Sequence, residues 1–219
     1  MEGIRPDLPP SVDVYTNCYT TIPLAPDHHL LFPTVYLRDR DLGVGYMAAS
    51  RDGKLWHFLP GSPVVTPGPP GRWDAGWKVP SPNLVELPNG DFALPCSAQP
   101  TPHKYPRGQL SIRTGYALWP KGRIVALEAP ERGEFTTKPL AVDARRLRIN
   151  AVTQRAGSIL LEVAGVPGRS FADCDPIIGD HYRKSVTCKG QEDLGVSKET
   201  PVVLRFRLDK AKIFGLDFE

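Results

Sequence analysis

The chain has 219 residues, of which 41% are hydrophobic and 23% are charged, a composition typical of a soluble globular protein. Its 27 Lys and Arg against 24 Asp and Glu give a net charge of +3, and the two signs are interleaved without a basic run. This pattern excludes nucleic acid as an expected partner. No apolar run approaches the ~20 residues that a membrane-spanning helix needs, so no membrane partner is expected either.

The first residues, MEGIRPDLPPSVDVY, contain no positively charged segment followed by an apolar stretch. They therefore indicate no secretory signal and a cytoplasmic location. The four cysteines, Cys18, Cys96, Cys174 and Cys188, form no CxxC pair and have no histidine at zinc-ligand spacing. We interpret them as buried free thiols, with a Cys174–Cys188 disulfide as the alternative.

The 24 prolines and 20 glycines are spread along the chain, which leaves little room for long helices and predicts an all-β protein. Eight strand-like runs follow one another in the first part of the chain: 14–21, 28–37, 44–50, 55–59, 81–87, 91–98, 112–119 and 123–129. Turn signals recur between them, at Asp52-Gly53 and Asn89-Gly90. Two consecutive four-stranded antiparallel meanders are typical of β-propeller blades, so residues 1–130 are predicted to form a partial propeller of two blades.

The character of the sequence changes at about Glu131. Six runs in residues 131–219 alternate apolar and polar side chains and are separated by polar turns. This pattern predicts a compact C-terminal β-sandwich, with the domain boundary inside residues 129–133.

Segments spread over nearly the whole chain carry a resemblance to a known family: DVYTNCYTTIPLAPDHHLLFPTVY, SRDGKLWH, GRWDAGW, PHKYPR, GEFTTKPL and DCDPIIGDH. They resemble bacterial glycosyl-hydrolase-like or sialidase-like proteins that join a five-bladed propeller to a C-terminal β-sandwich. The resemblance implies that this chain corresponds to the last blades and the sandwich, without the N-terminal blades. It informs the fold more than the substrate.

The stretch WKVPSPNLVEL bears on whether glycosidase chemistry is retained. In propeller glycosidases of the invertase and levanase type, the general acid is the Glu of a Glu-Cys-Pro-Asp-Leu-Phe segment, which residues 80–85 resemble. That Glu falls on Pro80 and the following Asp on Asn83, and the Arg-Asp-Pro segment that supplies another carboxylate has no counterpart. Because glycoside cleavage needs two carboxylates roughly 5–10 Å apart, the resemblance implies a degenerate glycosidase site.

In a propeller, the starts of the inner strands and the blade-to-blade connections lie on one face, where loops usually carry function. On this face we predict three catalytic residues, Asp13, Asp74 and His103. The residues predicted to bind substrate are Trp73, Trp77, Lys104, Tyr105 and Arg107. Structural alternatives remain open: Asp74 as a turn cap, His103 as a surface residue, the tryptophans as packing between blades, and the cations as solvated side chains. Residues 38–41 are expected to form a solvated turn with weak ion pairs.

Other polar residues are interpreted as structural. Asp52 resembles the turn residue of the Asp-box of sialidases, and Glu86 is a charge at the edge of a turn. His28 and His29 are adjacent and point to opposite sides of a strand, so both cannot readily bind one metal. Residues 173–181 gather three aspartates and a histidine, and a polar loop is preferred there to a calcium-type site.

These observations leave three functions open for a small-molecule or carbohydrate ligand. The first is a hydrolase-like protein derived from a propeller glycosidase, with a degenerate site. The second is a hydrolase of ester or phosphate-ester bonds that uses a divalent cation, with Asp13, Asp74 and His103 as bases or metal ligands and Lys104 or Arg107 stabilising negative charge. The third is a non-catalytic carbohydrate-binding protein.

Assembly follows from the blade count. Two blades leave one face of each uncovered, and the apolar side chains of residues 44–50 and 92–98 are expected there. Because a large exposed apolar patch is rare on a monomer, we expect a homo-oligomer, and prefer a trimer that closes a six-bladed ring to a dimer.

Overall fold

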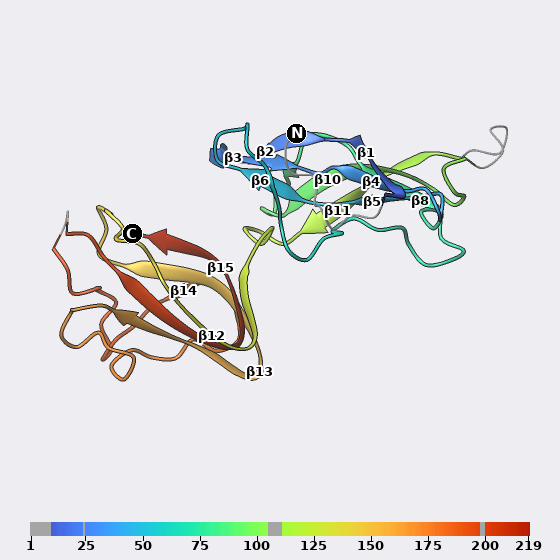
Figure 1. Ribbon diagram of the computed structural model, residues 1–219. Helices are drawn as coiled ribbons and strands as arrows, with labels where there is room; N and C mark the ends of the chain where they lie inside the picture. Colours follow the sequence, from blue (N-terminus) through green and yellow to red (C-terminus); the bar gives the residue numbers. More distant parts are fainter. Residues whose placement is uncertain (1–9, 24, 105–110, 198–199) are drawn as a thin grey trace. The chain divides into compact units, whose positions relative to one another are not determined.

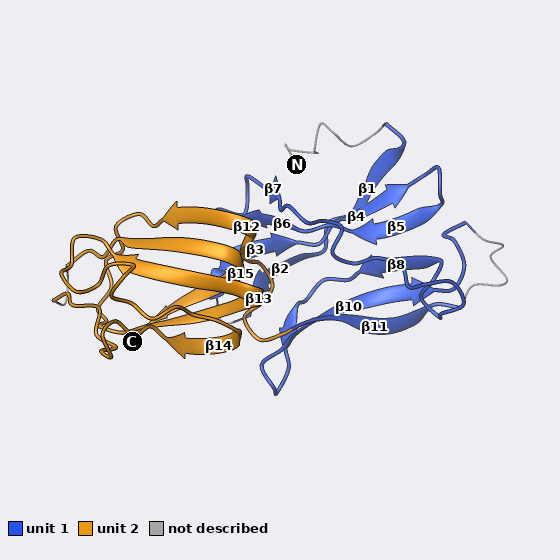
Figure 2. Cartoon of the chain, turned by 90° about the horizontal axis from the view of Figure 1, so that it is seen from below, with its two compact units in different colours: residues 1–119 blue, residues 120–219 orange. Residues whose placement is uncertain are grey.

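The structure is a computed structural model that describes residues 10–23, 25–104, 111–197 and 200–219. Regular structure in this part of the chain consists of strands in four antiparallel sheets, without a helix (Figure 1). The expectation of an all-β protein is confirmed. None of the described residues forms a helix long and apolar enough to cross a membrane. The chain divides into two compact units, Met1–Trp119 and Pro120–Glu219 (Figure 2).

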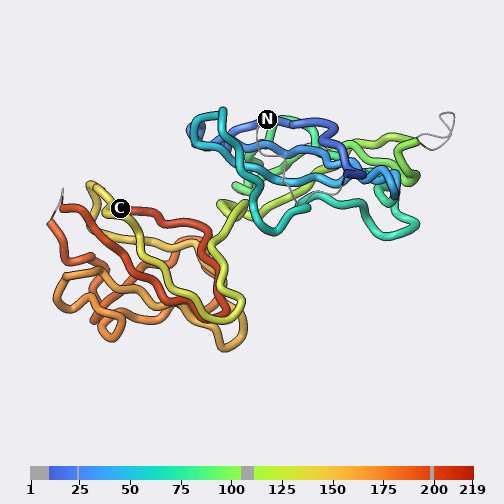
Figure 3. The backbone as a smooth tube through the Cα atoms, viewed as in Figure 1, coloured from blue at the N-terminus to red at the C-terminus, as the bar shows by residue number. Residues whose placement is uncertain are grey.

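The first expected meander is present, but each of its first three strands is broken into two short ones. The strands are β1 (Val12–Thr16), β2 (Tyr19–Ile22), β3 (Ala25–Leu31), β4 (Thr34–Leu37), β5 (Leu42–Gly45), β6 (Ala48–Ser50) and β7 (His57–Phe58). They form two sheets, in the orders β1-β4-β5 and β2-β3-β6-β7, so the expected succession of antiparallel neighbours is kept. The backbone in Figure 3 doubles back on itself along this part of the chain.

The breaks have local causes. Cys18, between β1 and β2, has a φ of 45°, which a strand does not accommodate. Pro33, between β3 and β4, has no N–H to donate to a ladder. Backbone hydrogen bonds still join the chain segments at these breaks to each other: Phe32 N–H donates to Cys18 O at 3.2 Å, and Tyr46 N–H donates to Pro33 O at 2.9 Å.

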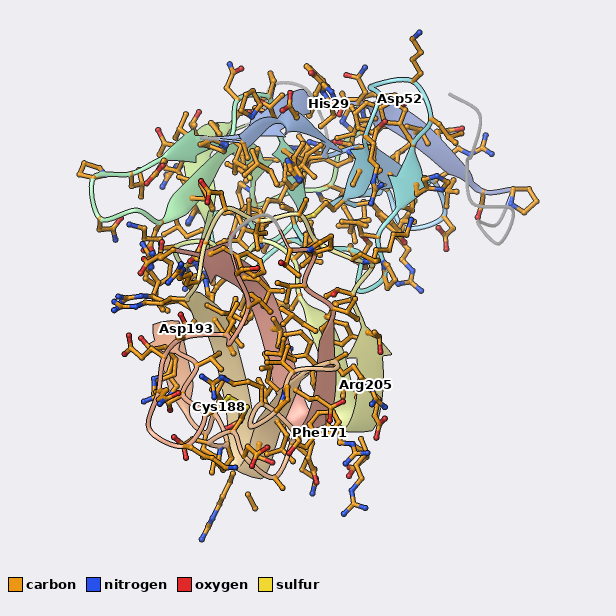
Figure 4. The ribbon with its side chains drawn as sticks, turned by 90° about the vertical axis from the view of Figure 1, so that its left-hand side faces the viewer. His29, Asp52, Phe171, Cys188, Asp193 and Arg205 are labelled. Carbon is orange, nitrogen blue, oxygen red and sulfur yellow. A yellow bond between two sulfur atoms is a disulfide. The ribbon has the colours of Figure 1, made fainter. Side chains whose placement is uncertain are left out.

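The turn between β6 and β7 is organised by Asp52. Its Oδ1 accepts hydrogen bonds from the N–H groups of Lys54 at 2.8 Å and Leu55 at 2.9 Å and from the Ser50 hydroxyl at 3.0 Å. The donors Leu55 and Lys54, followed by Ser50, lower the pKa of Asp52 to about 2. The interpretation of Asp52 as a turn residue is confirmed. His29 lies beside this turn, with its ring within 3.9 Å of the position a Cβ would take at Gly53 (Figure 4).

The turn predicts a pH-dependent contribution to stability. The folded pKa of Asp52, about 2, lies below the value of about 3.9 expected in an unfolded chain. Its contribution is therefore complete above about pH 4 and is lost as the pH falls towards 2. We expect Asp52→Ala to lower the free energy of unfolding at pH 7, and the difference from wild type to shrink between pH 4 and pH 2. Urea titrations at a series of pH values measure this, and a difference that grows on acidification would contradict it.

The second meander has three strands along its main path. Its strands are β8 (Trp77–Pro80), β9 (Val85–Glu86), β10 (Phe92–Gln99) and β11 (Arg113–Trp119), in the order β11-β10-β8 with β9 also paired to β10. The expectation that residues 123–129 supply its fourth strand is wrong. Residues from Leu127 onwards pair with the last strand of the chain instead.

Glycines let the sheets of the N-terminal unit approach closely. A Cβ added to Gly43 would lie 2.7 Å from the Trp77 ring, and one added to Gly45 would lie 2.9 Å from Val65. Side chains expected on exposed blade faces are buried instead: Val44, Met47, Ala48, Phe92, Ala93, Leu94, Cys96 and Ala98. The expectation that these side chains are exposed is wrong. They therefore give no support to a ring of subunits that would close over exposed blade faces.

The C-terminal unit is built on one long sheet. Its strands are β12 (Leu127–Thr136), β13 (Leu147–Val163), β14 (Asp180–Ser185) and β15 (Leu204–Phe218), in the order β12-β15-β13-β14. One face carries the core, which includes Leu147, Ile149, Ile159, Leu161, Val163, Leu204 and Phe206. Irregular segments between β13 and β15 supply Cys174, Ile177, Cys188, Leu194 and Val202 to the same core. The described residues of the C-terminal unit thus contain one sheet, where a sandwich of two was expected.

The division of the chain falls before residue 120, whereas the sequence placed the boundary at residue 130. Leu127 pairs with Ile213 and Thr136 with Arg205, so β12 belongs to the C-terminal sheet along its whole length. Arg123 extends this attachment by donating to Asn150 Oδ1 at 2.9 Å.

Cys174 and Cys188 form a disulfide, and only Cys18 and Cys96 are free and buried. The expectation of four free thiols is therefore wrong, and its alternative holds. The loops beside the disulfide are held by Arg169, which is buried and donates to Asp193 O at 2.7 Å and to Gln191 Oε1 at 2.9 Å. Cys188 and Asp193 lie in this part of the C-terminal unit (Figure 4).

The disulfide closes a loop with a sequence separation of 14. In the chain-entropy account, a bridge across a loop of this size stabilises the folded state by about 3 kcal/mol. We expect Cys188→Ser to lower the free energy of unfolding of the C-terminal unit by about this amount, measured by urea unfolding. Reduction of the wild-type protein is expected to produce the same loss, and reduction of the variant no further loss. Titration of four free thiols in the unreduced, unfolded wild type would contradict the disulfide.

Candidate functional site

A cleft of about 640 Å³ lies in the N-terminal unit between the sheets that contain β1 and β8. Its described lining comes from the four strands β1, β4, β8 and β10 and from the segment between β10 and β11: Tyr15, Thr16, Thr34, Trp77, Val79, Ser97, Gln99, His103, Lys104 and Ile112. Val79 pairs with Ser97 and Trp77 with Gln99 across neighbouring strands, so these four side chains share one face of their sheet. The described lining combines aromatic rings, hydroxyls, an amide and two basic residues, without a carboxylate.

His103 occupies the centre of an aromatic cluster at this cleft. Its ring stacks on Trp77 with 4.3 Å between the ring centroids, and meets Tyr15 at 5.3 Å and Tyr36 at 5.5 Å edge-on. Its Nε2 lies 3.1 Å from the Tyr15 hydroxyl. His103 is therefore fixed from several sides rather than free on the surface.

Asp41 anchors the segment that carries His103 and Lys104. Its carboxylate accepts hydrogen bonds from the Tyr36 hydroxyl at 2.6 Å and the Lys104 N–H at 2.7 Å, and its carbonyl accepts the His103 N–H at 3.2 Å. Burial opposes ionisation of Asp41, but the hydrogen bonds from Tyr36 and Lys104 outweigh it, and the pKa of this carboxyl is lowered. The sequence predicts a solvated turn at residues 38–41 and does not reveal that Asp41 anchors the segment of His103 and Lys104.

Asp74 is placed elsewhere, in a buried ion pair. Its Oδ2 accepts from Lys78 Nζ at 3.0 Å, and its Oδ1 lies 3.7 Å from Arg72 Nε. Burial opposes ionisation, but the hydrogen bond and charge of Lys78, with the charge of Arg72, outweigh it and lower the pKa of Asp74. The two cations beside this carboxylate disfavour a metal ion there. Asp74 does not line the cleft.

The remaining predicted residues are dispersed. Asp13 is half exposed, lies 3.4 Å from Arg38 in an ion pair, and is absent from the cleft lining. Trp73 packs on β11, where a Cβ at Gly115 would lie 2.7 Å from its ring. Tyr105 and Arg107 lie outside the described residues. Of the predicted set, the structure brings together Trp77, His103 and Lys104. Tyr15 joins them, and the sequence did not single it out.

Pro80, the position that the resemblance aligns with the glycosidase acid, lies inside the protein. Pro80 is buried at the end of β8, and its carbonyl accepts the Cys18 thiol at 3.2 Å. A Cβ at Gly45 would lie 3.0 Å from the Pro80 ring. This position therefore faces packed side chains and backbone rather than a ligand.

The acidic residues of the C-terminal unit are engaged by the protein itself. Asp173 binds Lys189 at 2.8 Å and the Ser170 hydroxyl at 2.6 Å, and these donors lower its pKa to about 2. Asp175 accepts from Thr187 at 2.6 Å, and Asp180 from Arg123 at 2.6 Å. Among the described residues no group of three His, Cys, Asp or Glu side chains is arranged to hold a metal ion. These contacts support the interpretation of residues 173–181 as a structural polar loop.

The chain matches no protein-family model, no curated protein and no solved structure. The resemblance to propeller glycosidases therefore rests on the sequence segments alone.

The burial of Asp74 predicts a structural role. Removal of its carboxylate leaves Lys78, whose side chain is only 20% exposed, without its partner. We expect Asp74→Ala to lower the free energy of unfolding by about 3 kcal/mol, measured by urea unfolding. Asp13→Ala, which breaks the exposed pair with Arg38, serves as the control and should change stability by less than about 1 kcal/mol. Equal stability of both variants would contradict this assignment.

Proposed function

We propose that the protein is a carbohydrate-binding relative of propeller glycosidases, and that its N-terminal unit holds a saccharide in the Tyr15–His103 cleft without cleaving it. The observation that carries this proposal is the lining of the cleft, in which the accessible ring of Tyr15 lies beside hydroxyl and basic side chains. Saccharide sites require this combination because sugar rings present apolar C–H faces and a rim of hydroxyls.

Tyr15 is the accessible ring of the cluster. It is 54% exposed, whereas Trp77 is only 8% exposed and has one face covered by His103. A sugar ring therefore stacks on Tyr15 and meets the edge of His103, while Trp77 supports both from behind. Ser97 and Lys104 supply polar groups along the same cleft. The Gln99 amide is only 3% exposed and donates to the carbonyls of Thr101 and Pro102, so it shapes the wall of the cleft.

The geometry favours binding over hydrolysis. Cleavage of a glycoside requires a pair of carboxylates across the bond, and the described lining has none. Asp13 and Asp74 are each committed to a cation outside the cleft, and Pro80 is buried. No observation among the described residues favours the alternative of a metal-dependent esterase or phosphoesterase.

Two features support the relationship to propeller blades. The first meander keeps the blade order of four successive antiparallel strands. The turn between its third and fourth strands has the hydrogen-bonded Ser50–Asp52 arrangement expected of an Asp-box. We interpret the N-terminal unit as two blades of which the second lacks its outer strand, and the loops opposite the C-terminal sheet as a reduced second layer of the sandwich.

The disulfide bears on the compartment. Disulfides persist mainly where the surroundings are oxidising, and they are rare in the cytoplasm of most organisms. The Cys174–Cys188 bridge thus supports a location outside the cytoplasm, against the cytoplasmic location that the sequence indicates.

The proposal predicts a defined loss of binding. A glycan array of neutral and acidic oligosaccharides would identify a ligand, and calorimetric titration would measure its affinity. Loss of the Tyr15 ring is expected to weaken binding about tenfold, the equivalent of one aromatic contact. Tyr19→Ala is the matched control, because Tyr19 is 46% exposed on β2 and does not line the cleft.

Three results would overturn the proposal. The first is the absence of binding to every saccharide on the array at millimolar concentration. The second is equal affinity of Tyr15→Ala and Tyr19→Ala for the ligand found. The third is turnover of aryl glycosides, aryl esters or phosphate esters by the wild-type protein.

A further inference from the structure

Strand β11 forms an open edge of the N-terminal unit. It spans seven residues and pairs with β10 on one side, and within the described residues no strand pairs with its other side. Alternate side chains in and before this strand are strongly exposed: Ile112 at 65%, Tyr116 at 61% and Leu118 at 62%. An apolar row of this kind on an unpaired strand is a template for further pairing.

The outward backbone groups of β11 can be assigned from Pro95. The Pro95 carbonyl accepts the Ser81 N–H at 2.8 Å, so the backbone groups of Pro95 point towards β8. Its partner in register on the other side is Tyr116. Because hydrogen-bonded and non-hydrogen-bonded pairs alternate in an antiparallel ladder, Tyr116 directs its N–H and C=O away from β10. Thr114 and Leu118 share this direction.

Apart from Arg113 at its first position, β11 lacks the features by which proteins usually block pairing. The edge strand β12 of the C-terminal sheet contains Pro130 and several charged residues, and the other edge strand, β14, contains Asp180, Arg183 and Lys184. By contrast, residues 114–119 of β11 contain neither a charge nor a proline. Charges and prolines are the usual protection of an exposed edge, so β11 is left open.

We propose that β11 pairs with β11 of a second copy of this chain, antiparallel about a two-fold axis at Tyr116. This register places Tyr116 opposite Tyr116 of the other copy, and Thr114 opposite Leu118. Arg113 then faces Trp119 rather than another arginine, so the pairing brings no like charges together. The same edge serves both copies, as an isologous dimer requires.

A second copy fits this edge because the outward backbone groups of the two strands meet in this register and no like charges face each other. The contact is a single strand pair, smaller than the ~800 Å² per partner of a standard interface. We therefore expect a reversible dimer with a dissociation constant in the micromolar range. It uses a strand edge and leaves the buried faces of the meanders intact.

Sedimentation equilibrium of the full chain, from low micromolar to about 0.2 mM, tests this dimer. We expect a concentration-dependent monomer–dimer equilibrium, and at least tenfold weaker association for Tyr116→Lys, which adds a charge to the edge. Tyr19→Lys, at an exposed tyrosine on β2, is the matched control and should associate like the wild type. Equal unfolding midpoints of the two variants would show that Tyr116→Lys folds.

A cross-link tests the register without relying on affinity. In the proposed pairing the two Cα atoms at position 116 belong to a hydrogen-bonded pair and lie about 5.5 Å apart, within reach of a disulfide. Tyr116→Cys should form a covalent dimer when oxidised glutathione accepts the two electrons, and Leu55→Cys, at a comparably exposed site, should not. A monomeric wild type at the highest concentration, a trimer, or equal cross-linking at both sites would overturn the proposal.

Discussion

The packing of Trp77 against Gly43 is the contact on which the N-terminal unit depends. The ring lies where a side chain at position 43 would otherwise be, and this close approach joins the sheet of β5 to the sheet of β8. One face of the buried ring then stacks on His103. Trp77 is fixed by this packing and offers a rigid ring for His103 to stack on, while Asp41 holds the backbone of the segment that carries His103.

The sequence predicts the succession of strands well and their continuity poorly. Alternating apolar residues and the signals at Gly53 and Gly90 are local, so the meanders and their turns follow from short stretches. The break at Pro33 has a visible cause in the sequence, whereas the break at Cys18 depends on a backbone conformation that has no signature in the neighbouring residues. Residues 127–130 could pair either with the sheet of β11, as the sequence predicts, or with β15, as the structure shows. Pairing with the long strand β15 satisfies the whole of β12, and no local pattern reveals that outcome.

The candidate site was predicted only in part, because some of its residues depend on contacts between distant segments. Loops after strands carry His103 and Lys104 to the cleft, as the sequence indicates. The roles of Asp74 and Asp41 depend on which partners fold against them: Lys78 four residues away in one case, and Tyr36 with Lys104 in the other. The sequence offered the Cys174–Cys188 bridge only as the alternative to free thiols, because no motif marks the two irregular segments that it joins.

The electrostatics of the unit explain why a binding role fits better than an acid-base role. A general acid near neutral pH needs a carboxyl whose pKa is raised, so that it still holds a proton to give. Hydrogen bonds and cations lower the pKa of Asp41 and of Asp74, so both remain ionised at neutral pH. The carboxylate oxygens of Asp41 accept hydrogen bonds from Tyr36 and Lys104, which orients Lys104 at the cleft. The carboxylate of Asp74 pairs with the ammonium group of Lys78. These two carboxylates therefore have structural roles, and the described lining of the cleft combines rings, hydroxyls, an amide and two basic side chains. This lining is the basis of the proposed binding role.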